Sequence, residues 1–509
     1  MNMRAAPRLL TYLLPSLGNV LWMSAFLAVI GLGPRMMNID GDLGRHLTIG
    51  AYILDQRQVP LIDLFSHTMP NQPLTPHEWL SQVSFALSAR WMGLDGVVLL
   101  AALVIATTFW RVYRQSVDAA GGVLLPVVVT LLAMAASSLH WLTRPHIFTF
   151  LLLALWIDAL DAMRCGRLRA WWRLPVLMLF WANLHGAFIA GFVTWALYGA
   201  GQAWDILSKR SDPAVPGFWR FFGLGGLVAA LVTLINPAGL KLWTTSVGYV
   251  GTRYLVDHTA EYLSSDFHNV STWPFLLFAG LLLVAFGLQS RRVPARQVLI
   301  SAAWLVMALY SARNVPLFAI LAAPGLGAIL AAWLADHQHH VRLAAAWNGL
   351  EKRLAAVENS LRGALWPVAL FGLAAFILGA GIALDFNQQG NRFDPEVFPV
   401  EAVDWLAENP ASGPGFNYFP WGGYLLYRLW PEQTVFIDGQ TDFYGEHLTR
   451  QYEQVLTLSP GWQQVLTEYK VGWLLLPPEE ALAQTLLADP GWQVAYRDET
   501  AVLLVAGAK

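Results

Sequence analysis

The sequence predicts a polytopic α-helical membrane protein with a small α/β domain at its C-terminal end. Hydrophobic residues make up 56% of the 509 residues and charged residues only 13%, whereas soluble domains carry roughly 25% charged residues. The charges lie in short clusters between long apolar runs, which is the pattern of a multi-span protein. Aromatic residues, including 24 Trp, are frequent near the ends of these runs, where interfacial rings are expected.

About eleven apolar segments approach the length needed to cross a hydrocarbon core of ~30 Å. The first is expected to remain as an uncleaved span, because Pro34-Arg35 follows it in place of a small-residue cleavage site. The pair around Asn183–Gly186 can also be one long broken helix. The expected spans are 12–33, 94–112, 121–139, 147–163, 171–184, 187–206, 221–235, 272–289, 297–312, 315–333 and 366–385.

Arg and Lys residues concentrate in alternate loops, as in the loop with Arg164, Arg167, Arg169 and Arg173. The positive-inside rule then places the N-terminus in the cytoplasm and the C-terminus outside, in agreement with an odd number of spans. The formal net charge is only −2, and no nucleotide-binding motif is present, so nothing indicates a nucleic-acid partner. Anionic membrane lipids are the expected contact of the basic 334–365 segment.

Two domains are expected, a transmembrane domain over 1–386 and an extracytoplasmic α/β domain over 387–509. The first outer loop, 35–95, contains an amphipathic surface helix over 78–92, and the second large outer loop is 236–270. In the tail, predicted strands at 434–438, 471–476, 492–496 and 501–505 alternate with helical segments, which is typical of a layered α/β domain.

Most of the 12 histidines fall in the outer loops or at outer span ends, together with acidic residues and arginines. Ionisable groups at these positions are costly unless they face water or one another, so the sequence predicts a shared polar cleft. The simpler alternative is that each is an ordinary polar loop residue. The histidines are His46, His67, His77, His140, His146, His185, His258 and His268, and the acids are Asp40, Asp42, Asp63, Glu78, Asp257, Glu261 and Asp266.

The segment directly after the first span, Asp40-Gly-Asp42-Leu-Gly-Arg45-His46, combines acids, a cation and an imidazole. Paired carboxylates beside a histidine can act as a general base or hold a divalent cation such as Mg or Mn. We therefore expect Asp42, Asp40 and His46 to be the catalytic candidates and, equally, the candidates for a metal site. An ordinary Asp-Gly-Asp turn is the alternative interpretation.

Other span mouths carry arginines beside prolines, in Arg144-Pro-His146 and Arg313-Asn-Val-Pro316. A guanidinium in a fixed loop can capture a phosphate or diphosphate by paired hydrogen bonds. Snorkelling toward lipid headgroups explains the same pattern without a ligand.

The arrangement resembles the GT-C membrane glycosyltransferases, which use lipid-linked sugar donors. The first-loop stretch from Asp40 to Leu54 looks like that of uncharacterised bacterial members, and Trp421-Gly-Gly-Tyr424 followed by 435–442 is similar in layout to the W-W-D-Y-G segment of oligosaccharyltransferase catalytic subunits. Two departures stand out. Position 422 is Gly where that segment has Asp, and 138–144 lacks the acidic motif that some relatives use to hold a metal.

The resemblance implies inverting transfer of a sugar from a polyprenyl phosphate or diphosphate carrier to an acceptor glycan, lipid or protein on the outer face of a bacterial plasma membrane. Asp42 or Asp40 would be the base, oriented by His46. The donor phosphate would contact Arg45, Arg144, His146, Arg253 and Arg313, and the acceptor side would include His77, Glu78, Trp421, Tyr424 and Asp438. Two alternatives stay open, namely a lipid-carrier transporter or flippase that uses the same cleft, and a non-catalytic membrane scaffold whose tail is a docking domain.

Overall fold

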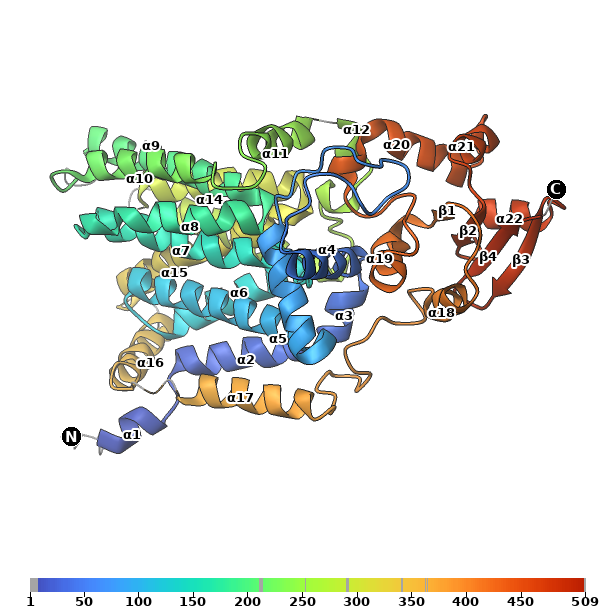
Figure 1. The fold of residues 1–509 in the computed structure, drawn as a ribbon. Helices are drawn as coiled ribbons and strands as arrows, with labels where there is room; N and C mark the ends of the chain where they lie inside the picture. The colour runs from blue at the N-terminus through green and yellow to red at the C-terminus, as the bar shows by residue number, and fades with distance from the viewer. Residues whose placement is uncertain are drawn as a thin grey trace.

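The protein is a bundle of helices with the tail domain seated on one end, opposite the N-terminus (Figure 1). The computed structural model describes residues 8–209, 214–251, 253–289, 293–339, 342–361, 363 and 365–507. The bundle helices are α1 (Arg8–Leu13), α2 (Leu17–Gly31), α5 (Trp79–Ala120), α6 (Leu124–Ser137), α7 (His146–Arg164), α8 (Arg173–Leu184), α9 (Ile189–Leu207), α10 (Phe218–Val232), α13 (Trp273–Gln289), α14 (Ala295–Tyr310), α15 (Val315–His337) and α17 (Leu365–Gly379).

Each expected span coincides with one or two of these helices. The first is divided, because the chain breaks at Pro15 and the Ser16 hydroxyl then caps α2 by accepting a hydrogen bond from the Asn19 amide at 3.1 Å. Within the described residues, four helical segments are long and apolar enough to cross a membrane, namely Trp79–Ala120, His146–Arg164, Val270–Gln289 and Ala312–His337. The remaining apolar helices are shorter, so the number eleven stays a prediction.

The expected surface helix over 78–92 and the following span are two limbs of α5, which has 42 residues. The helix kinks at Met92 and Gly93, where Gly93 has a φ of 62°. Glycine adopts this left-handed conformation without a steric cost, so Gly93 lets the chain turn from one limb into the other.

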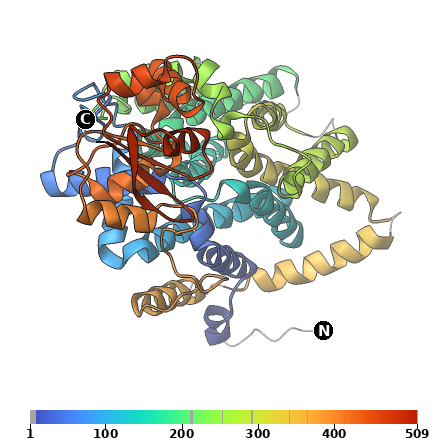
Figure 2. The same cartoon turned by 90° about the vertical axis from the view of Figure 1, so that its right-hand side faces the viewer.

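A further helix, α16 (Arg342–Glu358), lies across the end of the bundle opposite the tail domain (Figures 1 and 2). Its carboxylates hold the starts of two bundle helices. Glu351 accepts hydrogen bonds from the Leu124 amide at 3.1 and 3.2 Å, and Glu358 accepts one from the Leu17 amide at 2.8 Å. Anions at these positions satisfy free amides and favour the positive end of the helix dipole.

The two large loops lie at the tail-domain end. The first forms α3 (Gly33–Asn38) and α4 (Asp42–Gln56), and the second forms α11 (Lys241–Gly251) and α12 (Arg253–Asp257). The second loop reaches the tail domain, since the Arg450 guanidinium lies 3.7 Å from the ring centroid of Tyr254. It also meets the first loop where the Thr75 and Thr245 hydroxyls are 3.0 Å apart.

The tail domain has the α/β character that the sequence predicts, and it covers one side of the bundle end (Figure 2). Its four-stranded sheet has the order β1-β2-β4-β3, with β1 parallel to β2 and β4 antiparallel to both β2 and β3. The elements are α18 (Val400–Glu408), β1 (Gly415–Asn417), α19 (Gly422–Leu429), α20 (Thr441–Leu456), α21 (Trp462–Glu468), β2 (Trp473–Leu476), α22 (Ala481–Leu487), β3 (Trp492–Arg497) and β4 (Val502–Ala506).

One expected strand, 434–438, is wrong, and β1 takes its place in the sheet. Val435 makes only an isolated bridge with Ser66 of the first loop. The Asn417 side chain satisfies the next backbone groups, accepting from the Phe436 amide at 2.8 Å and donating to the Ile437 carbonyl at 2.9 Å. The run is apolar because it is buried between the tail domain and the first loop, an environment that resembles that of a central strand.

Candidate functional site

The first loop and the tail domain meet through glycines at the starts of α4 and α19. A side chain at Gly41 would collide with the Pro420 carbonyl, one at Gly44 with the Gly423 carbonyl, and one at Gly423 with the Gly41 carbonyl. Glycine is therefore required here for the two backbones to approach. This contact brings Asp42, the first residue of α4, to the tail domain.

Arg144, between α6 and α7, lies at the centre of three carboxylates. Its Nη1 is 3.4 Å from Asp40 Oδ2 and 3.2 Å from Glu261 Oε2. Its Nη2 forms an ion pair with Asp42 Oδ2. Asp40 and Asp42 come from the first large loop and Glu261 from the second, so one guanidinium joins three segments that are far apart in the sequence.

Arg313 extends this cluster. Its Nη1 is 3.5 Å from Glu261 Oε1, and its guanidinium lies 4.3 Å from the ring centroid of Tyr262. The aromatic face and the carboxylate together fix the plane of the guanidinium. Glu261 therefore bridges Arg144 and Arg313, two of the four arginines that the sequence predicts as phosphate ligands.

Asp40 and Glu261 contact the same nitrogen of Arg144 but differ in acidity. Burial raises the pKa of Asp40 to about 6, against the opposing effect of Arg144. Burial acts on Glu261 in the same direction, but the charges of Arg144 and Arg313 lower its pKa to about 2. Environments that push two carboxyl pKa values apart are typical of acid–base chemistry. Asp40 can exchange a proton near neutral pH while Glu261 stays charged.

A buried ion pair attaches the tail domain beside this cluster. Arg45 Nε lies 3.4 Å from Asp438 Oδ1, and Arg45 also donates to the Gln440 side chain. Asp438 accepts further hydrogen bonds from the Tyr444 hydroxyl at 3.2 Å and from the Gln440 amide at 2.8 Å. Burial nevertheless raises the pKa of Asp438 to about 6, against the effect of Arg45.

Three histidines surround Glu78 on the other side of Arg45. The Glu78 carboxylate lies 4.0 Å from His46 Nδ1, 3.8 Å from His77 Nε2 and 3.6 Å from His185 Nε2. His77 Nδ1 is also 3.9 Å from Asp442 of the tail domain. Burial raises the pKa of Glu78 and lowers that of His46, so burial favours the neutral form of both groups.

The cavity between these groups is small. Arg45, His77, Glu78 and Gln440 line a space of about 10 Å³, which is room for about one water molecule. A sugar does not fit in that space, so the histidine side of the site is closed in this conformation.

One predicted phosphate ligand, Arg253, lies away from the cluster. The Arg253 side chain is 93% exposed and pairs with Asp257 on its own helix at 3.4 Å, so the structure does not bring it to Arg144. His146 Nε2 is 2.7 Å from the carbonyl oxygen of His140, on the bundle side of the cluster.

Trp421 and Tyr424 are buried in the core. The Trp421 indole donates to the Val397 carbonyl at 2.9 Å, and the Tyr424 hydroxyl accepts from Arg428 at 3.1 Å. Both residues flank the glycine contact and position it, and neither faces the carboxylates directly.

The sequence assigned no role to Gly439 or Gln440, and it named Glu261 only among the acids of the predicted polar cleft. Glu261 belongs to the acidic residues of the outer loops, but only the folded chain places it beside Arg144. Gly439 lies against the Asp42 carboxylate, where a side chain would displace it. A glycine directly after Asp438, at the end of an apolar run, is the one signal in the sequence for this approach.

The oxygen ligands of Asp40, Asp42 and Glu261 suit Mg²⁺ or Mn²⁺ in chemical type. In this arrangement, however, they hold a guanidinium, and the 138–144 segment, which carries an acidic motif in some relatives, supplies Arg144 itself. His46 lies with Glu78 instead. Across the described part of the chain, no group of three or more His, Cys, Asp or Glu residues has the geometry to hold a metal ion. The residues therefore do not fit a resident divalent ion here.

Neither a protein-family model nor a curated protein matches this chain in sequence. Its fold is similar to that of the archaeal oligosaccharyltransferase AglB from Archaeoglobus fulgidus. The structure of AglB with an inhibitory peptide and a dolichol-phosphate matches with a TM-score of 0.58 and 12% identity, over 90% of this chain and 68% of AglB. The apo form gives the same score and identity over 90% and 70%. A complex with Zn and sulfate gives 0.53 and 11% over 90% and 67%. The chain therefore has a fold that is similar to that of AglB.

Proposed function

We propose that the chain transfers a sugar from a polyprenyl phosphate or diphosphate carrier to an acceptor on the outer face of a bacterial plasma membrane. The N-terminus is then cytoplasmic and the tail domain extracytoplasmic. The observation that carries this proposal is the convergence of Asp40, Asp42 and Glu261 on Arg144, with Arg313 beside them. The AglB-like fold, seen in a protein captured with a dolichol-phosphate, supports the same reaction class.

The donor phosphate is held by Arg313 and Arg144 at the mouths of α15 and α7. The isoprenoid chain stays in the lipid, and the phosphate lies at the interface. As the bond between the sugar anomeric carbon and the phosphate oxygen breaks, the electron pair remains on the carrier phosphate. The guanidiniums stabilise that charge more strongly in the transition state than in the ground state.

The acceptor attacks the anomeric carbon from the opposite face, which inverts its configuration. Its proton passes to Asp40 or Asp42. Asp40 is the better placed of the two as a base, because its raised pKa lies near neutral pH. Asp42 pairs with Arg144, and its carboxylate packs against Gly439. Asp42 is therefore the residue that fixes the position of the guanidinium.

The acceptor approaches from the side of the tail domain, past His77, Glu78 and Asp438. The Arg45–Asp438 pair and the glycine contact hold the tail domain over the base, and closure of the first loop excludes water that would hydrolyse the donor. A glycan, a lipid or a protein can each supply the attacking atom.

The experiment is transfer from a labelled lipid-linked sugar by membranes that contain Asp40→Asn, Asp42→Asn or the wild-type chain. Each substitution is expected to lower transfer by at least about 10²-fold, in line with the loss of a general base or of an electrostatic contact. Asp257→Asn, which affects only the exposed pair with Arg253, is the matched control. Wild-type transfer by both Asp40→Asn and Asp42→Asn would remove the proposed base.

A further inference from the structure

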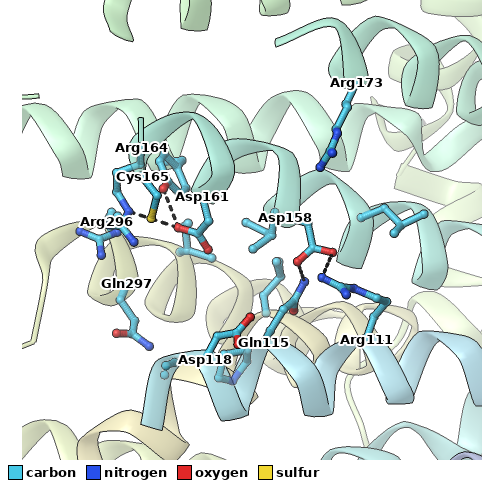
Figure 3. Close-up of a pocket in the computed structure, with 18 of the residues that line it drawn as sticks. Arg111, Gln115, Asp118, Asp158, Asp161, Arg164, Cys165, Arg173, Arg296 and Gln297 are labelled. Atoms are coloured by element: carbon cyan, nitrogen blue, oxygen red, sulfur yellow. Dashed lines mark hydrogen bonds and ion pairs between the residues drawn. The ribbon is translucent and has the colours of Figure 1, made fainter. Parts of the chain in front are cut away.

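A second polar site lies at the far end of the bundle, away from the tail domain. A cavity of about 1140 Å³ opens between α5, α7, α8, α9, α14 and α15 (Figure 3). His146 begins α7 near the carboxylate cluster, whereas Arg164, at the last residue of this 19-residue helix, lines the cavity. At 1.5 Å per residue the two ends of α7 are about 28 Å apart, close to the thickness of a hydrocarbon core. The two sites are therefore separate.

Ion pairs line the walls of this cavity. Arg111 Nη2 is 2.5 Å from Asp158 Oδ2, and Gln115 donates to Asp158 Oδ1 at 2.8 Å. One turn further along α7, Arg164 Nε lies 3.3 Å from Asp161 Oδ1, which also accepts from a tyrosine hydroxyl. Charged pairs within spanning helices are expensive, and they usually line a functional cavity or pathway.

The cavity has more cations than these carboxylates neutralise. Five arginines line it, Arg111, Arg164, Arg167, Arg173 and Arg296, against three aspartates, Asp118, Asp158 and Asp161. Arg296 is paired with Asp205, which lies outside the lining, at 3.7 Å. Arg167 and Arg173 are exposed and form no ion pair with any residue that the structure describes. Arg173 points into the space above Asp158 and Arg111 (Figure 3). Asp118 is the one lining carboxylate without an ion pair among the described residues, so two unpaired cations face one unpaired anion and the net charge is positive.

The remaining walls are apolar. Val176, Ile300, Leu321 and Pro324 from three different helices line the cavity alongside the charged groups. The volume exceeds the range of roughly 300–1,000 Å³ that is usual for small-ligand pockets. A ligand that contacts both the arginines and the apolar side chains of the cavity carries an anionic group and an apolar chain.

We propose that this cavity binds the phosphate group of an anionic membrane lipid, with Arg167 and Arg173 at the phosphate and the acyl chains against α14 and α15. Guanidiniums recognise phosphate by paired, charge-assisted hydrogen bonds. The basic loop between α7 and α8 lies on the side that the positive-inside rule assigns to the cytoplasm, where anionic headgroups are abundant. This inference does not depend on sugar transfer at the other end of the bundle.

The single cysteine of the chain, Cys165, is exposed and lines the same cavity, so its reactivity reports occupancy. The experiment measures the rate at which neutral N-ethylmaleimide labels the full chain in nanodiscs. Discs of phosphatidylcholine are compared with discs that also contain phosphatidylglycerol, and with phosphatidylcholine discs in inorganic phosphate. At a ligand level of four times Kd, labelling slows about five-fold.

Slowing by phosphatidylglycerol alone supports a lipid phosphate, and equal slowing by inorganic phosphate supports the same phosphate site with a free anion as its source. The double variant Arg167→Gln and Arg173→Gln leaves every ion pair of the cavity walls intact and is expected to abolish the slowing. Arg353→Gln, on the exposed face of α16, is the control for surface potential, and labelling of this variant is still expected to slow. Slowing that persists in the double variant, or no slowing in the wild-type chain, overturns the proposal.

Discussion

Arg144 and Asp40 lie 104 positions apart in the chain, and their side chains meet at 3.4 Å. The same guanidinium reaches Glu261, 117 positions further on, at 3.2 Å. One cation thus holds the first large loop, the second large loop and the start of α7 together. The proposed chemistry depends on this arrangement more than on any single carboxylate.

Replacement of Arg144 by lysine should therefore lower transfer by about 10²–10³-fold, the usual loss for one transition-state contact. A lysine ammonium is a compact point charge that cannot bridge three carboxylates as the planar guanidinium does. Initial rates with a labelled lipid-linked sugar measure this effect. Arg253→Lys, which alters an exposed pair away from the cluster, should keep the wild-type rate. Equal rates for the two variants would contradict the role of Arg144.

The pH dependence of transfer should follow Asp40. Its pKa is raised to about 6, so the carboxylate that accepts a proton is lost as the pH falls through 6. The rate should be level above pH 7 and fall about tenfold per pH unit well below 6. In Asp40→Asn the residual rate should lose this dependence. A wild-type rate that stays level down to pH 5 would assign the base to another group.

Gly439→Ala should impair transfer without unfolding the chain. The added methyl group would meet the Asp42 carboxylate and push it away from Arg144. We expect at least about a tenfold loss of transfer, because small displacements at a reacting centre are costly. Gly372→Ala in α17, where open space surrounds the added methyl, is the matched control and should be neutral. Thermal unfolding in detergent distinguishes a local effect from a folding defect.

Removal of divalent cations should leave the transfer rate within about twofold. Arg144 already occupies the centre of Asp40, Asp42 and Glu261, and a resident cation would have to displace it. The measurement is the rate after chelation with EDTA, followed by addition of Mg²⁺ or Mn²⁺. A large loss that Mn²⁺ restores would show that these carboxylates release Arg144 and bind the metal.

Asp438→Asn should destabilise the attachment of the tail domain. It removes one partner of a buried ion pair and leaves the Arg45 charge uncompensated, a change that costs about 3–5 kcal/mol. The midpoint of thermal unfolding in detergent should fall clearly. Asp404→Asn breaks a more exposed pair with Arg428 and should cost less than about 1 kcal/mol. Similar midpoints for the two variants would argue against a structural role for the Arg45–Asp438 pair.

The order of helices along the chain was predictable because apolar length is a local property. Composition alone also indicated the tail domain, and three of its four strands were placed correctly at 471–476, 492–496 and 501–505. The run 434–438 misled because its apolar residues are buried between two domains, where burial does not require strand pairing. The hydrophobic pattern of a short segment indicates that the segment is buried, but it does not show which part of the chain packs against it.

The members of the site were harder to predict, because their proximity depends on tertiary contacts. Arg144, Arg313, Asp40 and Asp42 were identified from their positions at span mouths, and the structure brings them together through Glu261. Arg253 has the same residue type in a loop on the same side, yet it points outward. The sequence distinguishes these arginines poorly. The one local difference is that a proline lies beside Arg144 and near Arg313.

The fate of the carrier tests the central claim most directly. Purified chain is incubated with a polyprenyl-phosphate-linked sugar and an acceptor fraction, and free carrier is measured alongside transferred sugar. The proposal predicts that free polyprenyl phosphate accumulates in step with product, and that Arg144→Lys lowers both by the same factor of about 10²–10³. Movement of the intact lipid-linked sugar across the bilayer without release of the carrier would contradict sugar transfer and identify a transporter.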